Sequence, residues 1–265
     1  MSSHKPSFPL PDRRAYALIA CAIAATLLGC RSSTDSRDII ASAIRHQGGP
    51  LLDRMELSFE LRDRRYRVLR DDGLFQYERY YADSTGEIHD VVNNDDLYRE
   101  LNGERVNLDS ARSRSVYSGV NSTVYFALIP QPLGDAAVRS RYLGSAQIDG
   151  HDYHEIEVTF VQDGGGLDYQ DRFVYWIRTD PPVVDYLAYY YYTDGGGSRF
   201  RKAVNQRRVG GVLFADYENY SAPRPPDFTG IESYDTLFLQ DSLSLVSEIN
   251  LENISVRQLS DNAGG

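Results

Sequence analysis

The sequence predicts a mostly β protein (α+β) in which a curved antiparallel sheet forms an open half-barrel, with helices covering its concave face. From residue 56 onward, most segments alternate apolar and polar residues, the period of a strand with one buried face. Glycine-containing turns separate these segments and are typical of antiparallel hairpins. Two segments, about 36–47 and 109–128, have helical spacing instead. A long meander must curl or be covered to bury its apolar side, and these helices are suitable covers.

The first thirty residues predict a lipoprotein signal peptide. Basic residues precede an uncharged run, residues 15–28. This run is shorter than the roughly 20 apolar residues that span a bilayer, but it suits the core of a signal peptide. It ends in Leu27-Leu28-Gly29-Cys30, which resembles the lipobox of bacterial lipoproteins. The resemblance implies cleavage before Cys30 and lipidation of its thiol, and the alternative is an ordinary secretory signal with a chance cysteine.

This leader sets the expected domain organisation and location. We expect a signal peptide at 1–29, a tether at 30–37 that carries the lipidated Cys30, one half-barrel domain at 38–258 and a flexible tail at 259–265. Two or three acyl chains would give lasting attachment, whereas one chain binds only marginally. The predicted location is therefore the cell envelope, as an outer-membrane lipoprotein on its periplasmic face or its surface.

Charge and cysteine content exclude several classes of function. The formal net charge of −10 predicts repulsion of nucleic acid. Of the two cysteines, Cys21 would leave with the signal and Cys30 would be lipidated, so none remains for a disulfide, a zinc site or a nucleophile. We expect no cofactor.

The elements follow in order along the chain. In the first helix, Ile39, Ile40, Ala43 and Ile44 form one stripe before Gly48-Gly49. In the second, which is one helix or two short ones, Tyr117, Val120, Val124 and Leu128 share a face. The predicted strands are 56–61, 64–70, 74–82, 86–92, 95–101, 138–144, 152–161, 169–178, 183–193, 199–209, 212–220, 231–240 and 243–257.

Tyr189 to Tyr192 are four consecutive tyrosines within one predicted strand. Successive strand residues point to opposite faces, so Tyr189 and Tyr191 face one way and Tyr190 and Tyr192 the other. Tyrosine suits a surface that is half apolar and half wet. We expect one pair to face the interior of the curved sheet and the other to meet solvent, a lid or a partner.

The same alternation in neighbouring strands predicts a shared apolar hollow. One face of the strand at 152–161 is apolar, and so is one face of the strand at 169–178. These faces would line the concave side with part of the tyrosine run, although plain core packing is the alternative for each residue. The candidate ligand-binding residues are Ile156, Val158, Phe160, Phe173, Tyr175, Ile177, Tyr189 and Tyr191.

Several stretches together resemble a known superfamily. They are Ala41 to Gly49, Tyr142 to Gly144, Tyr153 to Phe160, Asp171 to Ile177 and Arg208 to Tyr220. With the lipobox and the element order, they resemble the LolA/LolB-like superfamily of lipoprotein carriers, and most closely an uncharacterised family of Bacteroidota lipoproteins with a domain of unknown function. The resemblance implies an open half-barrel whose cavity receives acyl chains.

Signals for catalysis and metal binding are weak. His151 and His154 would point to opposite faces of a strand, and zinc needs three or four ligands in a tetrahedral array. Glu155 and Glu157 are expected on the solvated surface, and His46 at the C-terminus of the first helix, where a cation is favoured. No serine-nucleophile motif is present. We therefore expect no catalytic and no metal-binding residues.

The predicted function is a lipid-anchored envelope protein that binds a hydrophobic ligand in the concave face of its sheet. The ligand would be an acyl chain, a lipid or a lipoprotein. One alternative is a non-catalytic scaffold that binds an envelope protein or a glycan through exposed tyrosines. The other is an enzyme of unknown type.

Overall fold

The computed structural model describes residues 35–163, 169–192, 196–222 and 230–259. From Asp35 onward, the described residues form one compact unit. The predicted signal peptide and Cys30 lie outside the described residues, and the turns and loop at 163–166, 194–197 and 222–226 lie wholly or partly outside them.

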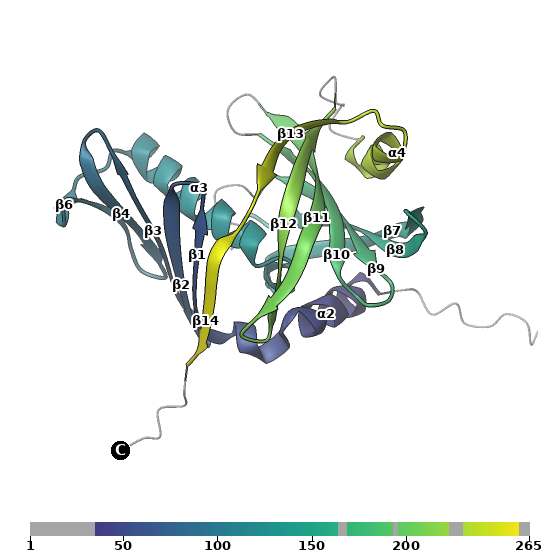
Figure 1. The fold of residues 1–265 in the computed structure, drawn as a ribbon, viewed down its shortest axis with the longest axis horizontal. Coiled ribbons are helices and arrows are strands. Elements are labelled where there is room, and N and C mark those ends of the chain that lie inside the picture. The colour runs from purple at the N-terminus through teal and green to yellow at the C-terminus, as the bar shows by residue number, and fades with distance from the viewer. Residues whose placement is uncertain (1–34, 164–168, 193–195, 223–229, 260–265) are drawn as a thin grey trace, which may run out of the picture. The chain divides into compact units, whose positions relative to one another are not determined.

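The described strands form two seven-stranded antiparallel sheets, here named sheet 1 and sheet 2 (Figure 1). Sheet 1 has the order β14-β1-β2-β3-β4-β5-β6. Its strands are β1 (Arg54–Leu61), β2 (Arg64–Asp71), β3 (Leu74–Asp83), β4 (Gly86–Asn93), β5 (Leu97–Leu101), β6 (Glu104–Val106) and β14 (Glu252–Gln258).

Sheet 2 is a continuous meander with the order β13-β12-β11-β10-β9-β8-β7. Its strands are β7 (Val138–Ile148), β8 (His151–Phe160), β9 (Arg172–Arg178), β10 (Val184–Tyr191), β11 (Gly197–Val209), β12 (Val212–Ser221) and β13 (Ser244–Ile249). The predicted class, mostly antiparallel β with an open half-barrel, is confirmed, and its described strands are divided between two sheets, each with two edge strands.

The chain passes from one sheet to the other within a segment that we predicted to be a single strand, 243–257. That prediction is wrong at its centre, because β13 ends at Ile249 and β14 begins at Glu252. At this break, Leu251 N donates to Asp216 Oδ1 at 2.8 Å. Arg207 Nη2 donates to the same carboxylate oxygen at 3.0 Å and also to Leu251 O. Side chains of sheet 2 therefore form hydrogen bonds with the main-chain N–H and carbonyl groups of Leu251, where the chain passes from one sheet to the other.

Two hairpins show why glycine is needed at their turns. Asp149 and Gly150 have φ of 50° and 80°, and Gly210 and Gly211 have φ of 57° and 87°. Positive φ at both central residues is the type I′ turn that matches the twist of antiparallel strands. At Gly210, a Cβ atom would also lie 2.7 Å from the Cβ of Val256, so only glycine fits there.

Two longer helices cover the sheets, as the sequence predicted. The first, α2 (Ser36–Gln47), has the predicted bounds, and Asp35 caps it by accepting from Arg37 N at 2.9 Å. The second, α3 (Ser110–Ala127), is a single helix that ends before a short 3-10 turn, η2 (Gln131–Gly134). Helix α2 contacts β7, β9 and β12 of sheet 2, whereas α3 contacts β3, β4 and β5 of sheet 1 (Figure 1).

The predicted strand at 231–240 is wrong, because this segment is helical. It forms η4 (Ile231–Ser233) and α4 (Tyr234–Leu239). Tyr234, Leu237 and Phe238 recur at helical spacing and pack on the sheet 2 face that carries Trp176 and Phe200. Burial against these aromatic rings selects the helix, and both faces of sheet 2 are thereby covered.

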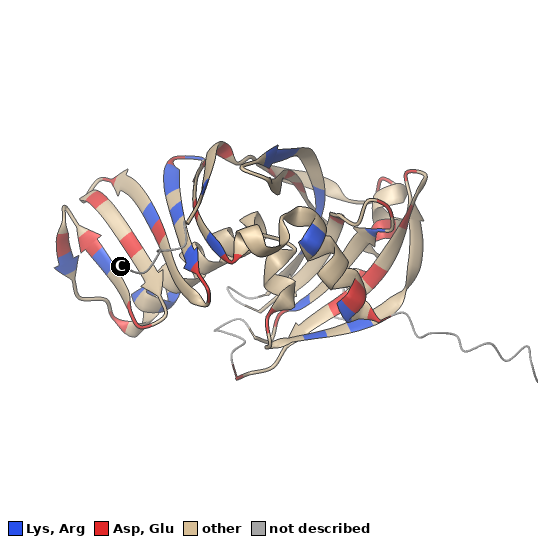
Figure 2. Cartoon of the chain, turned by 90° about the horizontal axis from the view of Figure 1, so that it is seen from below, with Lys and Arg blue, Asp and Glu red and all other residues tan. Residues whose placement is uncertain are grey.

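Positively and negatively charged residues are interspersed along the strands of sheet 1 (Figure 2). On the face opposite α3, Arg67 Nε lies 2.6 Å from Glu56 Oε1 and Arg67 Nη1 lies 2.8 Å from Glu78 Oε1. On the face beneath α3, Arg79 pairs with the fully buried Asp90 at 2.6 Å. These pairs balance charge within the sheet, so its acidic residues do not form a patch of one sign.

Candidate functional site

A large cavity lies between the helices and the sheets, with a volume of about 1630 Å³. This exceeds the roughly 300–1000 Å³ of a usual small-molecule pocket. Side chains of α2, α3, β9, β10, β11 and β12 line it, together with part of the β2–β3 hairpin. Its aromatic lining residues are Phe75, Tyr77, Tyr117, Tyr125, Phe126, Phe160, Phe173, Tyr189, Tyr191 and Tyr217.

Strand register explains why aromatic side chains gather on this side of sheet 2. Phe173 of β9 lies directly opposite Tyr189 of β10, and their rings stack with centroids 5.4 Å apart. The α3 residue Phe126 approaches the same tyrosine from the helix side, with ring centroids 5.2 Å apart. The cavity wall is therefore built by facing aromatic residues from a strand pair and a helix.

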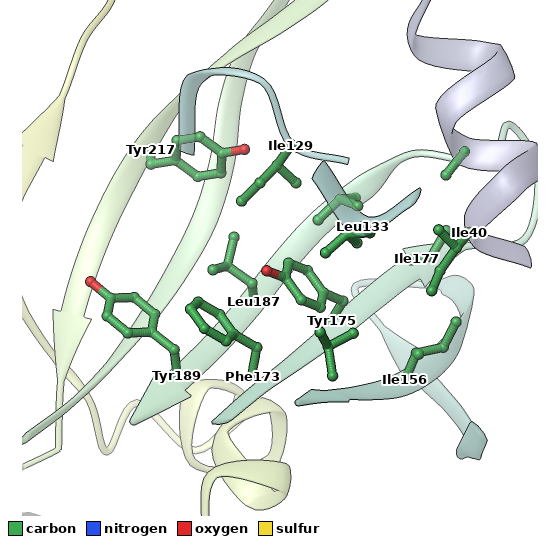
Figure 3. Packing of buried hydrophobic residues seen from close by; sticks show 13 residues of the cluster. Ile40, Ile129, Leu133, Ile156, Phe173, Tyr175, Ile177, Leu187, Tyr189 and Tyr217 are labelled. Atoms are coloured by element: carbon green, nitrogen blue, oxygen red, sulfur yellow. The ribbon is translucent and has the colours of Figure 1, made fainter. Parts of the chain in front are cut away.

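All eight predicted ligand-binding residues belong to, or pack against, one apolar cluster, shown in part in Figure 3. Four of them line the cavity: Phe160, Phe173, Tyr189 and Tyr191. The other four, Ile156, Val158, Tyr175 and Ile177, are fully buried. They pack with residues of α2, of the segment that follows α3 and of η2, namely Ile40, Ala43, Ile129 and Leu133.

The tyrosine run divides between the two faces of sheet 2 as predicted. Tyr189 and Tyr191 belong to the cavity side, and Tyr190 packs against the aromatic cluster under α4. Tyr192, at the end of the strand, is 48% exposed. The tyrosine run therefore contributes side chains to the packing on both faces of sheet 2.

The model for the Family of unknown function (DUF6503) matches residues 14–251. The chain belongs to this family. No curated protein matches the chain.

Solved structures similar to this DUF6503 protein include a LolA superfamily protein from Nitrosomonas europaea, with 13% identity, coverage of 86% of this chain and 96% of the other, and a TM-score of 0.48. A DUF1329 family protein from Desulfovibrio piger has 13% identity, coverage of 86% and 94%, and a TM-score of 0.42. The Mycobacterium tuberculosis lipoprotein LppX has 15% identity, coverage of 61% and 91%, and a TM-score of 0.28. A LolA superfamily protein is thus among the structures that the DUF6503 chain resembles, as the sequence predicted.

Buried phenols supply neutral polar groups to the cavity of this DUF6503 protein. The hydroxyls of Tyr125 and Tyr175 lie 2.8 Å apart. Burial raises the pKa of Tyr217 to about 12, and it also raises the pKa of Tyr125. These side chains therefore remain uncharged hydrogen-bonding groups at neutral pH.

Sequence reasoning missed the α3 residues and the cationic residues of the cavity. Tyr125 and Phe126 lie beside the predicted helical stripe, and only tertiary packing brings them to sheet 2. Arg199 and Arg201 line the cavity from β11. Their alternate positions in a predicted strand were the available signal, since this places both side chains on one face.

The other candidate residues lie away from the cavity. Among the described residues, no group of three or more His, Cys, Asp or Glu could hold a metal ion. Glu157, expected on the solvated surface, is largely buried and pairs with Arg172 at 2.7 Å. His46 lies at the C-terminus of α2, where Arg208 donates to its carbonyl at 2.7 Å.

None of the helices in the described ranges is both long and apolar enough to cross a membrane.

A smaller pocket of about 360 Å³ is bordered by Tyr153, Arg178, Asp185 and Gln206, among others. The Asp185 carboxylate accepts from all three other residues at 2.6–2.9 Å. This network satisfies the buried carboxylate and holds together β8, β9, β10 and β11 of the DUF6503 fold.

Proposed function

We propose that this protein binds an acyl chain of a lipid or lipoprotein in the cavity between α3 and sheet 2. The observation that carries the proposal is the cavity itself: about 1630 Å³ of space, walled largely by aromatic and aliphatic side chains. Such a space favours an apolar ligand, since each Å² of apolar surface removed from water contributes about 25 cal/mol.

The cavity lies in a well-packed frame. The residues beneath it are fully buried, and the rings of Phe126, Phe173 and Tyr189 contact one another from different elements. A preformed apolar site loses little conformational entropy when a ligand enters. The phenol hydroxyls can satisfy polar groups of the ligand without adding charge.

Membrane attachment is part of the proposal. A diacylated or triacylated Cys30 at the start of the mature chain would hold the protein at the cell envelope. A stationary, anchored protein with a lipid-sized cavity suits a receiver or a sensor of lipid in the outer membrane. The scaffold alternative has less surface to use, because only Tyr192 of the tyrosine run is exposed.

The test is a fluorescence titration of residues 35–265, the compact unit, with an uncharged pyrene-labelled fatty alcohol. We expect saturable binding to the wild-type protein. Ala215 lines the cavity, so Ala215→Phe should fill part of it and weaken binding by at least about tenfold. Val246 is 50% exposed on β13 and outside the cavity lining, so Val246→Phe serves as the matched control with unchanged affinity.

Non-saturable binding to the wild-type protein would contradict the proposal. Equal affinities for the wild type and Ala215→Phe would also contradict it, provided that both proteins unfold cooperatively. The thermal unfolding midpoint of each variant is measured first, because overpacking a core costs about 1–3 kcal/mol.

A further inference from the structure

Arg201 is a buried cation in the wall of the apolar cavity. It lies on β11, opposite Leu187 of β10 and Asn219 of β12, and it is 8% exposed. Its side chain lines the cavity. The apolar cluster around it is made of aliphatic and aromatic residues.

Among the described residues, the partners of the Arg201 guanidinium are aromatic rings and a phenol hydroxyl. Nη2 donates to the hydroxyl of Tyr189 at 3.0 Å. The guanidinium carbon lies 3.7 Å from the ring centroid of Phe126 and 5.2 Å from that of Tyr189. Nε is buried and has no hydrogen-bond partner in the part of the chain that the structure describes. A buried charge without a counter-charge is costly.

The other buried arginine of the described residues shows the contrast. Arg79 is 5% exposed, and it pairs with the fully buried Asp90 through Nε at 3.0 Å and Nη2 at 2.6 Å. No ion pair among the described residues includes Arg201. Of these two buried arginines, Arg79 therefore has a carboxylate partner, whereas Arg201 has none within the described ranges.

The charges along the cavity point to the same kind of ligand. Six arginines line it against three aspartates, in a chain whose formal net charge is −10. The arginines are Arg45, Arg62, Arg70, Arg114, Arg199 and Arg201. A low-dielectric cleft with more arginines than aspartates attracts an anion, although the net negative charge of the whole protein repels one.

We propose that the cavity ligand is an acyl chain that ends in a carboxylate, a long-chain fatty acid, and that its carboxylate pairs with Arg201. This inference rests on the proposed function and adds the head group to it. The adjoining rings of Phe126 and Tyr189, together with the hydroxyl of Tyr189, fix the position of the guanidinium in the cavity wall, where it can pair with a carboxylate. The chain itself then extends along Phe173 and the apolar wall.

The experiment compares palmitic acid with hexadecanol and hexadecyl phosphate, each displacing the pyrene-labelled fatty alcohol from residues 35–265. We expect palmitic acid to bind roughly 10- to 100-fold more tightly than hexadecanol, as a charge-assisted pair in a dry site requires. In Arg201→Met this preference should vanish while hexadecanol still binds. Arg201→Lys keeps the positive charge, so this variant should retain part of the preference for palmitic acid. Arg141→Met, on the exposed side of β7, is the control and should leave the preference intact.

Each outcome separates the two proposals. Equal affinities of the wild type for palmitic acid and hexadecanol would overturn the fatty-acid inference and leave the acyl-chain proposal standing. Tighter binding of hexadecyl phosphate than of palmitic acid would overturn the carboxylate assignment and point to a lipid phosphate. A preference that persists in Arg201→Met would exclude Arg201 as the partner. If none of the three ligands displaces the pyrene-labelled fatty alcohol from the cavity, the proposed function itself is overturned.

Discussion

Glu155 is a half-buried carboxyl group on β8 with an unusual titration. Burial, followed by the nearby charges of Asp235 and Glu232, raises its pKa to about 7, and Arg172 opposes this shift. Its Oε1 atom is buried, and no described residue forms a hydrogen bond with it. Sequence reasoning placed this glutamate on the solvated surface, where most acidic side chains lie. In the structure, Glu232 of η4 and Asp235 of α4 lie close to it.

This pKa predicts a pH dependence of stability. Between the ordinary pKa near 4.5 and the raised value near 7, the folded state keeps a proton that the unfolded state releases. The free energy of unfolding should therefore fall as pH rises through this window. Glu155→Gln should stabilise the protein at pH 8 more than at pH 5, as measured by urea unfolding at both pH values.

Glu157→Gln is the matched control on the same strand. Burial disfavours the charge of Glu157, but hydrogen bonds from Arg172 and Arg141 lower its pKa. Its stabilising charge is thus present above its ordinary pKa and is lost only as pH falls below it. This variant should lose stability at pH 8, and a gain there, or identical pH profiles for Glu155→Gln and the wild type, would contradict the assignment.

At the scale of elements, Gln47 joins the two longer helices. This buried residue at the end of α2 donates from Nε2 to the carbonyls of Leu128 and Ile129 at 3.0 and 2.9 Å. Its Oε1 accepts from Gln131 N at 3.1 Å. Leu128 O and Gln131 N also bond to each other at 2.8 Å, so Gln47 adds a second hydrogen bond to each of them and supplies one to the Ile129 carbonyl.

Gln47→Ala should lower the free energy of unfolding by about 2–3 kcal/mol, because it removes three hydrogen bonds of a buried side chain, one of them to the Ile129 carbonyl. Gln147→Ala changes an exposed glutamine on β7 and should stay within about 0.5 kcal/mol of the wild type. Chemical denaturation of both variants measures the difference. A cost for Gln47→Ala no larger than that of its control would contradict the role of this junction.

The elements also show what period and turn chemistry can predict. The stripe of Ile40, Ala43 and Ile44 and the following glycines predicted α2 correctly, since local signals determine both its face and its end. The segment 231–240 was misread because it is short and its apolar residues gain their helical contacts only from the aromatic face of sheet 2. The break at Leu251 depends on Asp216, which is distant in sequence, so no local pattern reveals it.

At the scale of the whole molecule, the sequence predicted the shared face of Phe173, Tyr175 and Tyr189 but not which of these residues meet open space. Register alone places all three on one side of sheet 2. The position of α2 and the end of α3 then decides that Tyr175 is covered while Phe173 and Tyr189 line the cavity. That arrangement depends on contacts between distant segments, which period-two alternation does not encode.

The most direct measurement is a crystal structure of residues 35–265 grown with a bromine-tagged palmitic acid and recorded at the bromine absorption edge. We predict anomalous density within the cavity, in contact with the ring of Phe173 or Tyr189, and the carboxylate beside Arg201. Bromine found only on the outer surface, for example at the exposed Leu245 of β13, with the cavity filled by protein or water, would contradict the account.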